Sequence, residues 1–242
     1  MDRLIYLSMA GAKATMQRQD TLANNLANAT TTGFRAEMQA FRAVPVRGDG
    51  ATTRAYALES TVGHNTQAGP TLTTGNPMDV AVQGQSWLAV QTLNGTEGYT
   101  RNGNLHVSSE GQVVTATGLT VMGDGGPITV PANASIEIAR NGTITAAVGN
   151  NKPTPVGKLK MVTPEAPMQR GDDGYFRPAD GGELPADETA TLQSGALEGS
   201  NVSPVETMVA MISAARQFEQ QMKMLQGAEP RDQAATKLLS AT

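Results

Sequence analysis

Hydrophobic positions recur with a helical spacing at both ends of the chain and with a strand spacing between them. Near the N-terminus, apolar or small residues alternate at steps of four and three, which is the pattern of a helix that packs along one stripe. The stripe comprises Ile5, Met9, Ala12, Met16, Gln19, Ala23 and Leu26. We therefore expect an N-terminal helix within residues 1–35. It should end near Gly33, whose left-handed backbone would close it before the apolar contact of Phe34.

The C-terminal part carries a second helical stripe with a clear start. Ser203 can cap this helix, Pro204 suits its first position and Glu206 completes a capping box. The stripe comprises Val205, Met208, Ile212, Ala215, Phe218, Met222 and Leu225. We expect a C-terminal helix within residues 201–242 that packs with the N-terminal helix in a coiled-coil-like pair. Gly227 and Pro230 predict that its regular part ends there.

The chain between the two helices falls into two parts. Residues 36–75 are repeatedly interrupted by Gly and Pro, so we expect an extended, irregular connecting segment. From residue 76 to 200, apolar and polar positions alternate, and Asn-Gly pairs mark tight turns between the runs. These pairs are Asn94-Gly95, Asn102-Gly103 and Asn141-Gly142. The expected fold class is α+β, with paired terminal helices flanking a mainly antiparallel β-domain.

Composition narrows the possible functions. Charged residues make up 17% of the chain, against about 25% in an average globular protein. A neutral polar surface can be desolvated at a subunit contact without burying unpaired charges. There is no Lys/Arg cluster to bind nucleic acid and no apolar run of the ~20 residues that a membrane helix needs. Cys is absent and His64 and His106 lie far apart, so we expect no metal and no cofactor.

Two groups of residues point to assembly. Asn24, Asn25 and Asn28 are poor helix formers because their amides compete for backbone hydrogen bonds. Either the helix frays here, or these amides bind across a helix–helix interface and set its register. Methionines such as Met208 and Met222 can fill a core or form an adaptable contact surface. We favour the surface, since the β-rich part shows no helical groove to receive them.

The expected assembly interface combines both helices and the segment after the first. Its members are Ile5, Met9, Met16, Asn24, Asn25, Leu26, Asn28, Gly33, Phe34, Met208, Ile212, Ala215, Phe218, Met222 and Leu225.

Five segments resemble the axial proteins of the bacterial flagellum, a family of rod, hook and hook-associated proteins. Ala23–Asn28, continued by Thr31–Arg35, is similar to the signature that these proteins share. The other four segments follow in the family's order: Gly75–Val82, Tyr99–Gly103, Gly195–Val202 and Arg216–Glu219. The start Met1–Tyr6 and the compact length resemble the proximal-rod branch most.

The resemblance implies a structural subunit of the flagellar basal-body rod without catalytic activity. Its terminal helices would assemble into the axial tube that transmits torque. Its partners would be other rod proteins, copies of itself and the flagellar type III export apparatus. It would reach the periplasm-spanning rod without a cleaved signal peptide and without inserting into the membrane.

Three alternatives remain open at this point. The chain could be a distal-rod or hook-type member of the same family. It could instead be a secreted β-domain enzyme acting on cell-wall glycan, which needs paired carboxylates such as Asp79 with Glu97 or Glu110. A membrane-acting amphipathic factor is the third, although the Asn, Gln and Ala content of the helices argues against it.

Overall fold

The computed structural model describes residues 2–45, 55–149 and 151–240, and the chain divides into two compact units. The first unit is built from Met1–Ala29, Ala36–His64 and Val202–Thr242, and the second from Thr30–Arg35 and Asn65–Asn201. One helix lies near each terminus and most strands form antiparallel sheets in the second unit. The expected α+β class is confirmed.

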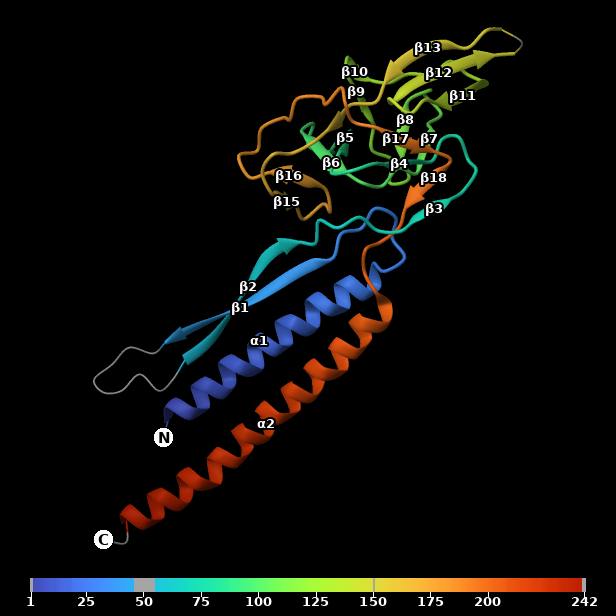
Figure 1. Ribbon diagram of the computed structural model, residues 1–242. Helices are drawn as coiled ribbons and strands as arrows, with labels where there is room; N and C mark the ends of the chain where they lie inside the picture. Colours follow the sequence, from blue (N-terminus) through green and yellow to red (C-terminus); the bar gives the residue numbers. More distant parts are fainter. Residues whose placement is uncertain (1, 46–54, 150, 241–242) are drawn as a thin grey trace. The chain divides into compact units, whose positions relative to one another are not determined.

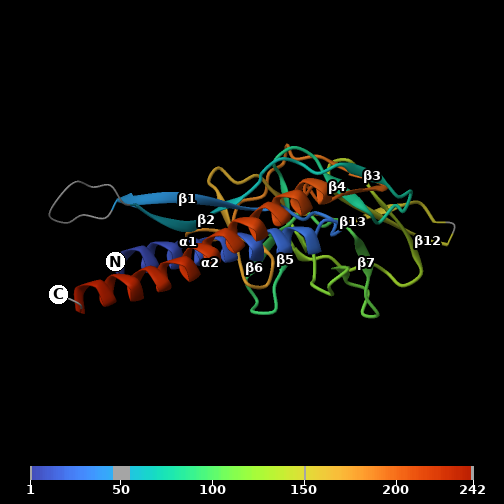
Figure 2. The ribbon, with the colours of Figure 1, turned by 90° about the horizontal axis from the view of Figure 1, so that it is seen from below.

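The first unit contains helix α1 (Asp2–Ala27), helix α2 (Pro204–Ser240) and a hairpin of β1 (Glu37–Pro45) and β2 (Ala55–His64). In Figure 1, α1 lies between the hairpin and α2, and in Figure 2, seen from below, α2 passes in front of α1. The hairpin is antiparallel from Glu37 opposite His64 to Pro45 opposite Ala55. Much of the segment expected to be irregular is therefore regular. Its register shift lies beside Met38, opposite Gly63, whose φ is 141°.

Helix α1 ends at Ala27, earlier than the turn at Gly33. The Asn28 side-chain amide donates to the Asn24 carbonyl oxygen at 2.9 Å and to the Asn24 Oδ1 at 2.9 Å. The Asn28 N–H donates to the same carbonyl oxygen at 3.1 Å, so the side chain shares this acceptor with the last helical hydrogen bond. The helix gives way to turns over the next residues, and Gly33 adopts the expected left-handed φ, 69°.

Helix α2 begins at Pro204, as predicted. The backbone N–H and the hydroxyl of Thr207 both donate to the Ser203 carbonyl oxygen, at 3.0 and 2.8 Å. The expected end at Gly227 is wrong, because the helix continues through Pro230 to Ser240. An interior proline costs a helix about 3 kcal/mol. Good helix formers flank it and favour continuation: Leu225, Gln226, Ala228, Ala234, Ala235, Lys237, Leu238 and Leu239.

The second unit is a β-domain whose strand pairs are all antiparallel within the described residues. Its largest described sheet has the order β14-β5-β6-β16-β15, and a three-stranded sheet has the order β11-β12-β13. Further pairs join β17 to β4, β18 to β3, β7 to β8 and β10 to β9. The strands are β3 (Thr71–Thr73), β4 (Val80–Val82), β5 (Trp87–Gln91), β6 (Glu97–Thr100), β7 (Leu105–Val107), β8 (Val113–Thr115), β9 (Met122–Gly123), β10 (Gly126–Pro127), β11 (Ala134–Ile138), β12 (Thr143–Val148), β13 (Thr154–Lys158), β14 (Met161–Val162), β15 (Met168–Arg170), β16 (Phe176–Pro178), β17 (Leu192–Ser194) and β18 (Ala196–Glu198).

Strand β5 is buried on both faces and separates two hydrophobic clusters. Leu88 and Val90 point into the larger cluster, with Ile144 and Leu159 among its members. Trp87 and Ala89 face the smaller cluster, in which the Trp87 and Phe176 ring centroids are 4.6 Å apart. Because successive side chains of a strand alternate in direction, one apolar run supplies both clusters.

Two of the three Asn-Gly pairs form the predicted hairpin turns. Gly95 joins β5 to β6 with a φ of 78°, and Gly142 joins β11 to β12 with a φ of 83°. Asn102-Gly103 is different. Gly103 lies so close to β4 that an added Cβ would be 1.7 Å from the Val80 carbonyl oxygen. This glycine therefore permits a close backbone crossing, a role that the dipeptide pattern does not distinguish from a turn.

Candidate assembly surface

Helices α1 and α2 contact each other in the first unit, and small side chains are buried on both of them. Ser8, Ala12 and Thr15 are buried on α1 at helical spacing, and Thr207 and Ala214 are buried on α2 seven residues apart. Gln221 of α2 lies over Gly11 of α1, where an added Cβ would be 3.2 Å from the Gln221 Cδ. Small residues let two helices approach closely, and they use little of the apolar surface that the two stripes contain.

Larger apolar side chains remain exposed beside these contact faces. On α1, Met9 and Met16 are 59% and 56% exposed. On α2, Met208 and Ile212 are 50% and 56% exposed. The same exposed class includes Tyr6, Val205, Val209, Met222 and Met224. Exposed apolar side chains on successive turns of a helix are typical of interaction surfaces.

The residues expected to form the assembly interface therefore fall into different environments. Leu26, Ala215, Phe218 and Leu225 are half-buried, while the side chain of Ile5 lies outside the described part of the structure. Asn24 is exposed and Asn28 is half-buried, and the two bind each other as described above.

Asn25 has a role inside its own chain that the sequence did not indicate. It is 6% exposed, its Nδ2 donates to the Glu37 carbonyl oxygen at 3.0 Å, and its Oδ1 accepts from the Glu37 N–H at 2.9 Å. These two bonds join the last turns of α1 to the start of β1. Its amide is therefore used within the subunit, in contacts with the start of β1.

Gly33 and Phe34 belong to the second unit and contact the β-domain. An added Cβ on Gly33 would come within 2.4 Å of the Arg101 carbonyl carbon. Phe34 is buried, and the Arg170 guanidinium lies 4.6 Å from its ring centroid. Phe34 also lines a cavity of about 530 Å³ together with Leu93, Tyr175 and Phe176. These two residues position the chain against the β-domain.

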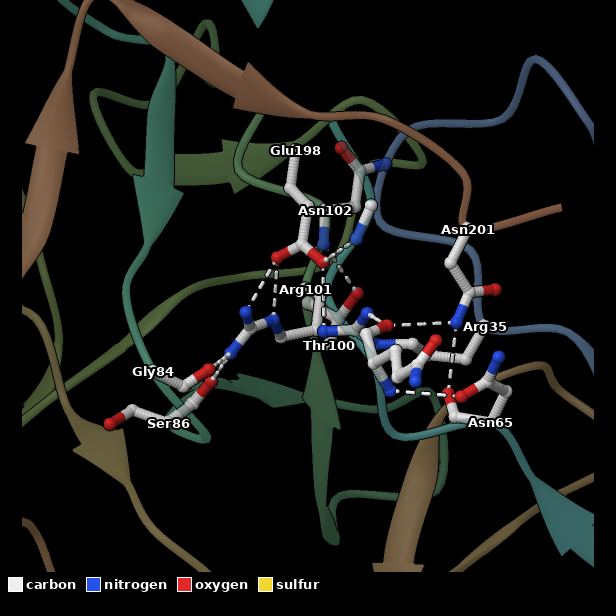
Figure 3. A network of polar contacts seen from close by, with 11 residues as sticks. Arg35, Asn65, Gly84, Ser86, Thr100, Arg101, Asn102, Glu198 and Asn201 are labelled. Atoms are coloured by element: carbon white, nitrogen blue, oxygen red, sulfur yellow. Dashed lines mark hydrogen bonds and ion pairs between the residues drawn. The ribbon is translucent and has the colours of Figure 1, made fainter. Parts of the chain in front are cut away.

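A buried cluster of three charged side chains holds this part of the second unit together (Figure 3). Glu198 Oε1 pairs with Arg35 Nη2 at 2.8 Å, and Glu198 Oε2 pairs with Arg101 Nη2 at 2.6 Å and Nε at 2.7 Å. All three side chains are at most 4% exposed. Arg101 also donates to the carbonyl oxygens of Gly84, at 3.0 Å, and Ser86.

The sequence contained a signal for this cluster that hydrophobic periodicity could not reveal. Arg35, Arg101 and Glu198 each lie in a different one of the segments that resemble the flagellar family. In a chain this poor in charges, a charged residue inside each such segment is a candidate for a buried pair. Nothing in the spacing showed that the three would meet.

The carboxylates named for the enzyme hypothesis are engaged in other contacts. Glu97 Oε1 pairs with Lys160 Nζ at 2.6 Å, and Glu97 Oε2 accepts from the Tyr99 hydroxyl at 2.9 Å. Burial is the main cause that raises the pKa of Tyr99. Asp79 is buried and its Oδ2 accepts from the Thr74 hydroxyl at 2.7 Å, whereas Glu110 is exposed in a turn. Within the described residues, no three acidic, histidine or cysteine side chains gather as a metal site would require.

Three family models match successive parts of the chain. The model described as flagella basal body rod protein matches residues 5–35. The flagellar hook protein FlgE/F/G D1 domain matches residues 81–146, and the flagellar basal body rod FlgEFG protein C-terminal matches residues 193–238. The class is therefore that of the flagellar axial proteins.

Relatives that match over nearly their full length show to which family of this class the chain belongs. The flagellar basal-body rod proteins FlgF of Salmonella typhimurium and of Escherichia coli K12 are each 46% identical over 250 residues, covering 99% of this chain and 99% of each relative. FlgG of Bacillus subtilis is 29% identical and covers 93% of this chain and 94% of its own length. The chain belongs to the FlgF family of flagellar basal-body rod proteins. The family resemblance predicted from the sequence is confirmed.

These relatives are rod proteins of the flagellar basal body, and the chain is a structural rod subunit of this kind. Neither described helix is apolar over enough of its length to cross a membrane.

Proposed function

We propose that this rod subunit assembles through the exposed apolar rows of its two terminal helices, which neighbouring subunits cover. The supporting observation is the exposure of Met9, Met16, Met208 and Ile212 beside a helix pair that is closed by small residues. Burial of apolar surface contributes about 25 cal/mol per Å², so covering several such side chains favours association strongly. Thioether side chains adapt to neighbours that differ in shape.

In this proposal α1 and α2 form a coiled-coil-like pair within each subunit. The buried Ser8, Ala12 and Ala214 allow the close approach that such a pair needs. The exposed rows then become the outer surfaces of the pair. Leu26, Phe218 and Leu225, which are half-buried, lie at its margin and complete the contact in the assembled rod.

The four parts of the chain that the sequence predicts have three roles in this proposal. Residues 1–35 and 201–242 supply the helical assembly surface, residues 36–75 connect it to the β-domain, and residues 76–200 form that domain. The assembled helices build the axial tube that transmits torque, and the non-closing contacts of a helical assembly suit such a tube.

The expected neighbours are copies of this chain and other rod proteins. The family further suggests export by the flagellar type III apparatus without a cleaved signal peptide, and a final place in the proximal part of the periplasm-spanning rod. We propose no enzymatic activity, since Asp79 and Glu97 are engaged in structural contacts and the relatives are structural proteins.

Deletion of residues 204–242 tests this function. The β-domain should stay folded, as followed by the fluorescence of Trp87, while the shortened chain fails to enter basal bodies in a strain that lacks the full-length protein. The full-length chain expressed at the same level is the control. Normal rod assembly with the shortened chain would refute the proposal.

A further inference from the structure

Four stretches of the chain meet around the Glu198 carboxylate, and they come from distant parts of the sequence. Glu198 Oε1 accepts from the Gly69 N–H at 3.1 Å as well as from Arg35. Its Oε2 binds Arg101 of the β-domain. One oxygen therefore holds the segments that contain Arg35 and Gly69, and the other oxygen attaches them to the domain.

Backbone hydrogen bonds follow the same arrangement. The Gly33 N–H donates to the Glu198 carbonyl oxygen at 2.7 Å, and the Gly199 N–H donates to the Pro70 carbonyl oxygen at 2.8 Å. The Asn201 N–H donates to the Phe34 carbonyl oxygen at 3.2 Å. The Asn201 amide also donates to the carbonyl oxygens of Asn65 and Gln67, at 3.0 and 2.8 Å. In Figure 3, the Asn201 amide points toward Asn65.

The segments tied in this way are those that lead out of the second unit. The chain passes between the two units at residues 29–30, 35–36, 64–65 and 201–202. Every one of these passages begins or ends in residues 30–35, 65–70 or 196–201, which we call the connecting segments. The contacts around Glu198 thus hold all three connecting segments on the β-domain.

The charges of the cluster make Glu198 its indispensable member. Two guanidinium groups face a single carboxylate, so loss of that carboxylate leaves two buried positive charges together. Desolvation lowers the pKa of Arg35, and the neighbouring Arg101 acts in the same direction while Glu198 opposes it. Loss of Arg35 is different, because it leaves a neutral Arg101–Glu198 pair.

We propose that Glu198 is a positioning residue that clamps the three connecting segments to the β-domain, and that this clamp is required for incorporation into the rod. The second half of this statement rests on the proposed function. The first half concerns the isolated chain and stands independently of it.

Hydrogen exchange on the purified full-length chain tests the clamp. In Glu198→Gln, residues 30–35, 65–70 and 196–201 should exchange about 100-fold faster, because one partner of a buried ion pair is lost. Residues 87–91 of β5 should keep their protection. Glu165→Gln is the matched control, since Glu165 is exposed, and it should change none of these rates. Unchanged exchange in the connecting segments of Glu198→Gln would overturn the proposal, as would equal loss of protection in β5.

Arg35→Met separates a clamp from general destabilisation. It should release residues 30–35 most, and residues 65–70 to a smaller extent because Arg35 also donates to the Gln67 carbonyl oxygen. Residues 196–201 should keep their protection, because the Arg101–Glu198 pair and the Gly69 bond remain. Wild-type protection of residues 30–35 in this variant would overturn the proposal, and this holds even if Glu198→Gln does not fold.

The incorporation of each variant into basal bodies tests whether the clamp is required for rod assembly. Glu198→Gln should be lost from basal bodies although α1 and α2 are unaltered in sequence, whereas Glu165→Gln should be retained. Normal incorporation of Glu198→Gln despite released segments would refute the requirement. Absence of the wild-type chain from basal bodies would instead refute the proposed function, and hydrogen exchange would still decide the clamp.

Discussion

Asn25 and Glu37 form two reciprocal hydrogen bonds, with the Asn25 side chain pairing both backbone polar groups of Glu37 at 3.0 and 2.9 Å. An asparagine amide reproduces the donor and acceptor of a peptide group, so it can extend a β-ladder by one residue. Here it attaches α1 to the hairpin in the first unit. Gln39, on the same strand, continues the attachment by donating to Thr21 and to the Gln17 carbonyl oxygen.

Asn25→Ala should destabilise the first unit by about 1–3 kcal/mol, because both backbone groups of Glu37 lose their partner. Asn24→Ala is the matched control, since Asn24 is exposed and its neighbour Asn28 still reaches a backbone carbonyl. Urea denaturation followed by helical circular dichroism measures both. Equal midpoints for the two variants would contradict the role given to Asn25.

Gly33→Ala should weaken the docking of residues 30–35 because two costs combine. The φ of 69° costs an L-residue about 1–2 kcal/mol, and the added Cβ meets the Arg101–Asn102 backbone at 2.4 Å. Gly75→Ala isolates the first cost, because Gly75 has a φ of 77° and nothing within 4 Å of its Cβ position. Thermal unfolding should therefore show a larger loss for Gly33→Ala. Equal losses would mean that the close approach does not matter.

Gly103→Ala tests the backbone crossing over β4. Its Cβ would overlap the Val80 carbonyl oxygen at 1.7 Å, so the two segments must separate and the β-domain should lose several kcal/mol, by analogy with an overpacked core. Gly125→Ala, with open space around it, should be close to neutral. The comparison uses denaturation followed by Trp87 fluorescence. A neutral Gly103→Ala would show that this crossing can relax.

Asp187 should titrate far below an ordinary aspartate. The Thr163 hydroxyl is the main cause and the Thr189 hydroxyl the next, and together they lower the pKa of Asp187 from 3.8 to about 2. Because the folded-state pKa is depressed, the stability that this group contributes is present above about pH 4 and is lost as the pH falls through about 2. NMR titration of the carboxyl carbon measures it. Thr163→Val should raise the midpoint toward 3.8. An unchanged midpoint would show that the Thr163 hydroxyl does not lower the pKa of Asp187.

The sequence predicted those features of the fold that depend on local pattern. Helical spacing located α1 and α2, and Pro204 marked the start of α2 correctly. Asn94-Gly95 and Asn141-Gly142 identified two hairpins because only a few residue types accept a left-handed backbone. These features are decided by residues close together in the chain.

Features that depend on distant residues were not predictable in this way. Asn25 was recognised as unusual, but its contact with Glu37 was not predicted, because spacing does not show that a strand lies beside the helix. Glu198 and Arg101 are 97 positions apart, and no period connects them. The stripe that contains Met9 and Met16 was identified correctly as apolar, yet only the structure shows that small neighbouring residues make the helix pair and leave these methionines exposed.

Replacing Met208 and Ile212 together by Ser should leave the isolated subunit as stable as before, within about 0.5 kcal/mol, because both side chains are already largely exposed. Assembly should fall, since the apolar row is interrupted. Gln217→Ser with Gln220→Ser, also exposed on α2, is the control and should assemble normally. The measurement is the yield of basal bodies and swimming motility. Unimpaired assembly of the Met208 and Ile212 variant would show that this apolar row takes no part in rod assembly.

The most direct test of the assembly surface uses the absence of native cysteine in the chain. A single Ile212→Cys should react rapidly with a maleimide in the purified subunit, and Ala214→Cys, which replaces a side chain only 1% exposed, should react slowly. In isolated basal bodies, Ile212→Cys should become as slow as Ala214→Cys, because neighbouring subunits cover it. Equal rapid labelling of Ile212→Cys in the free subunit and in basal bodies would contradict the account.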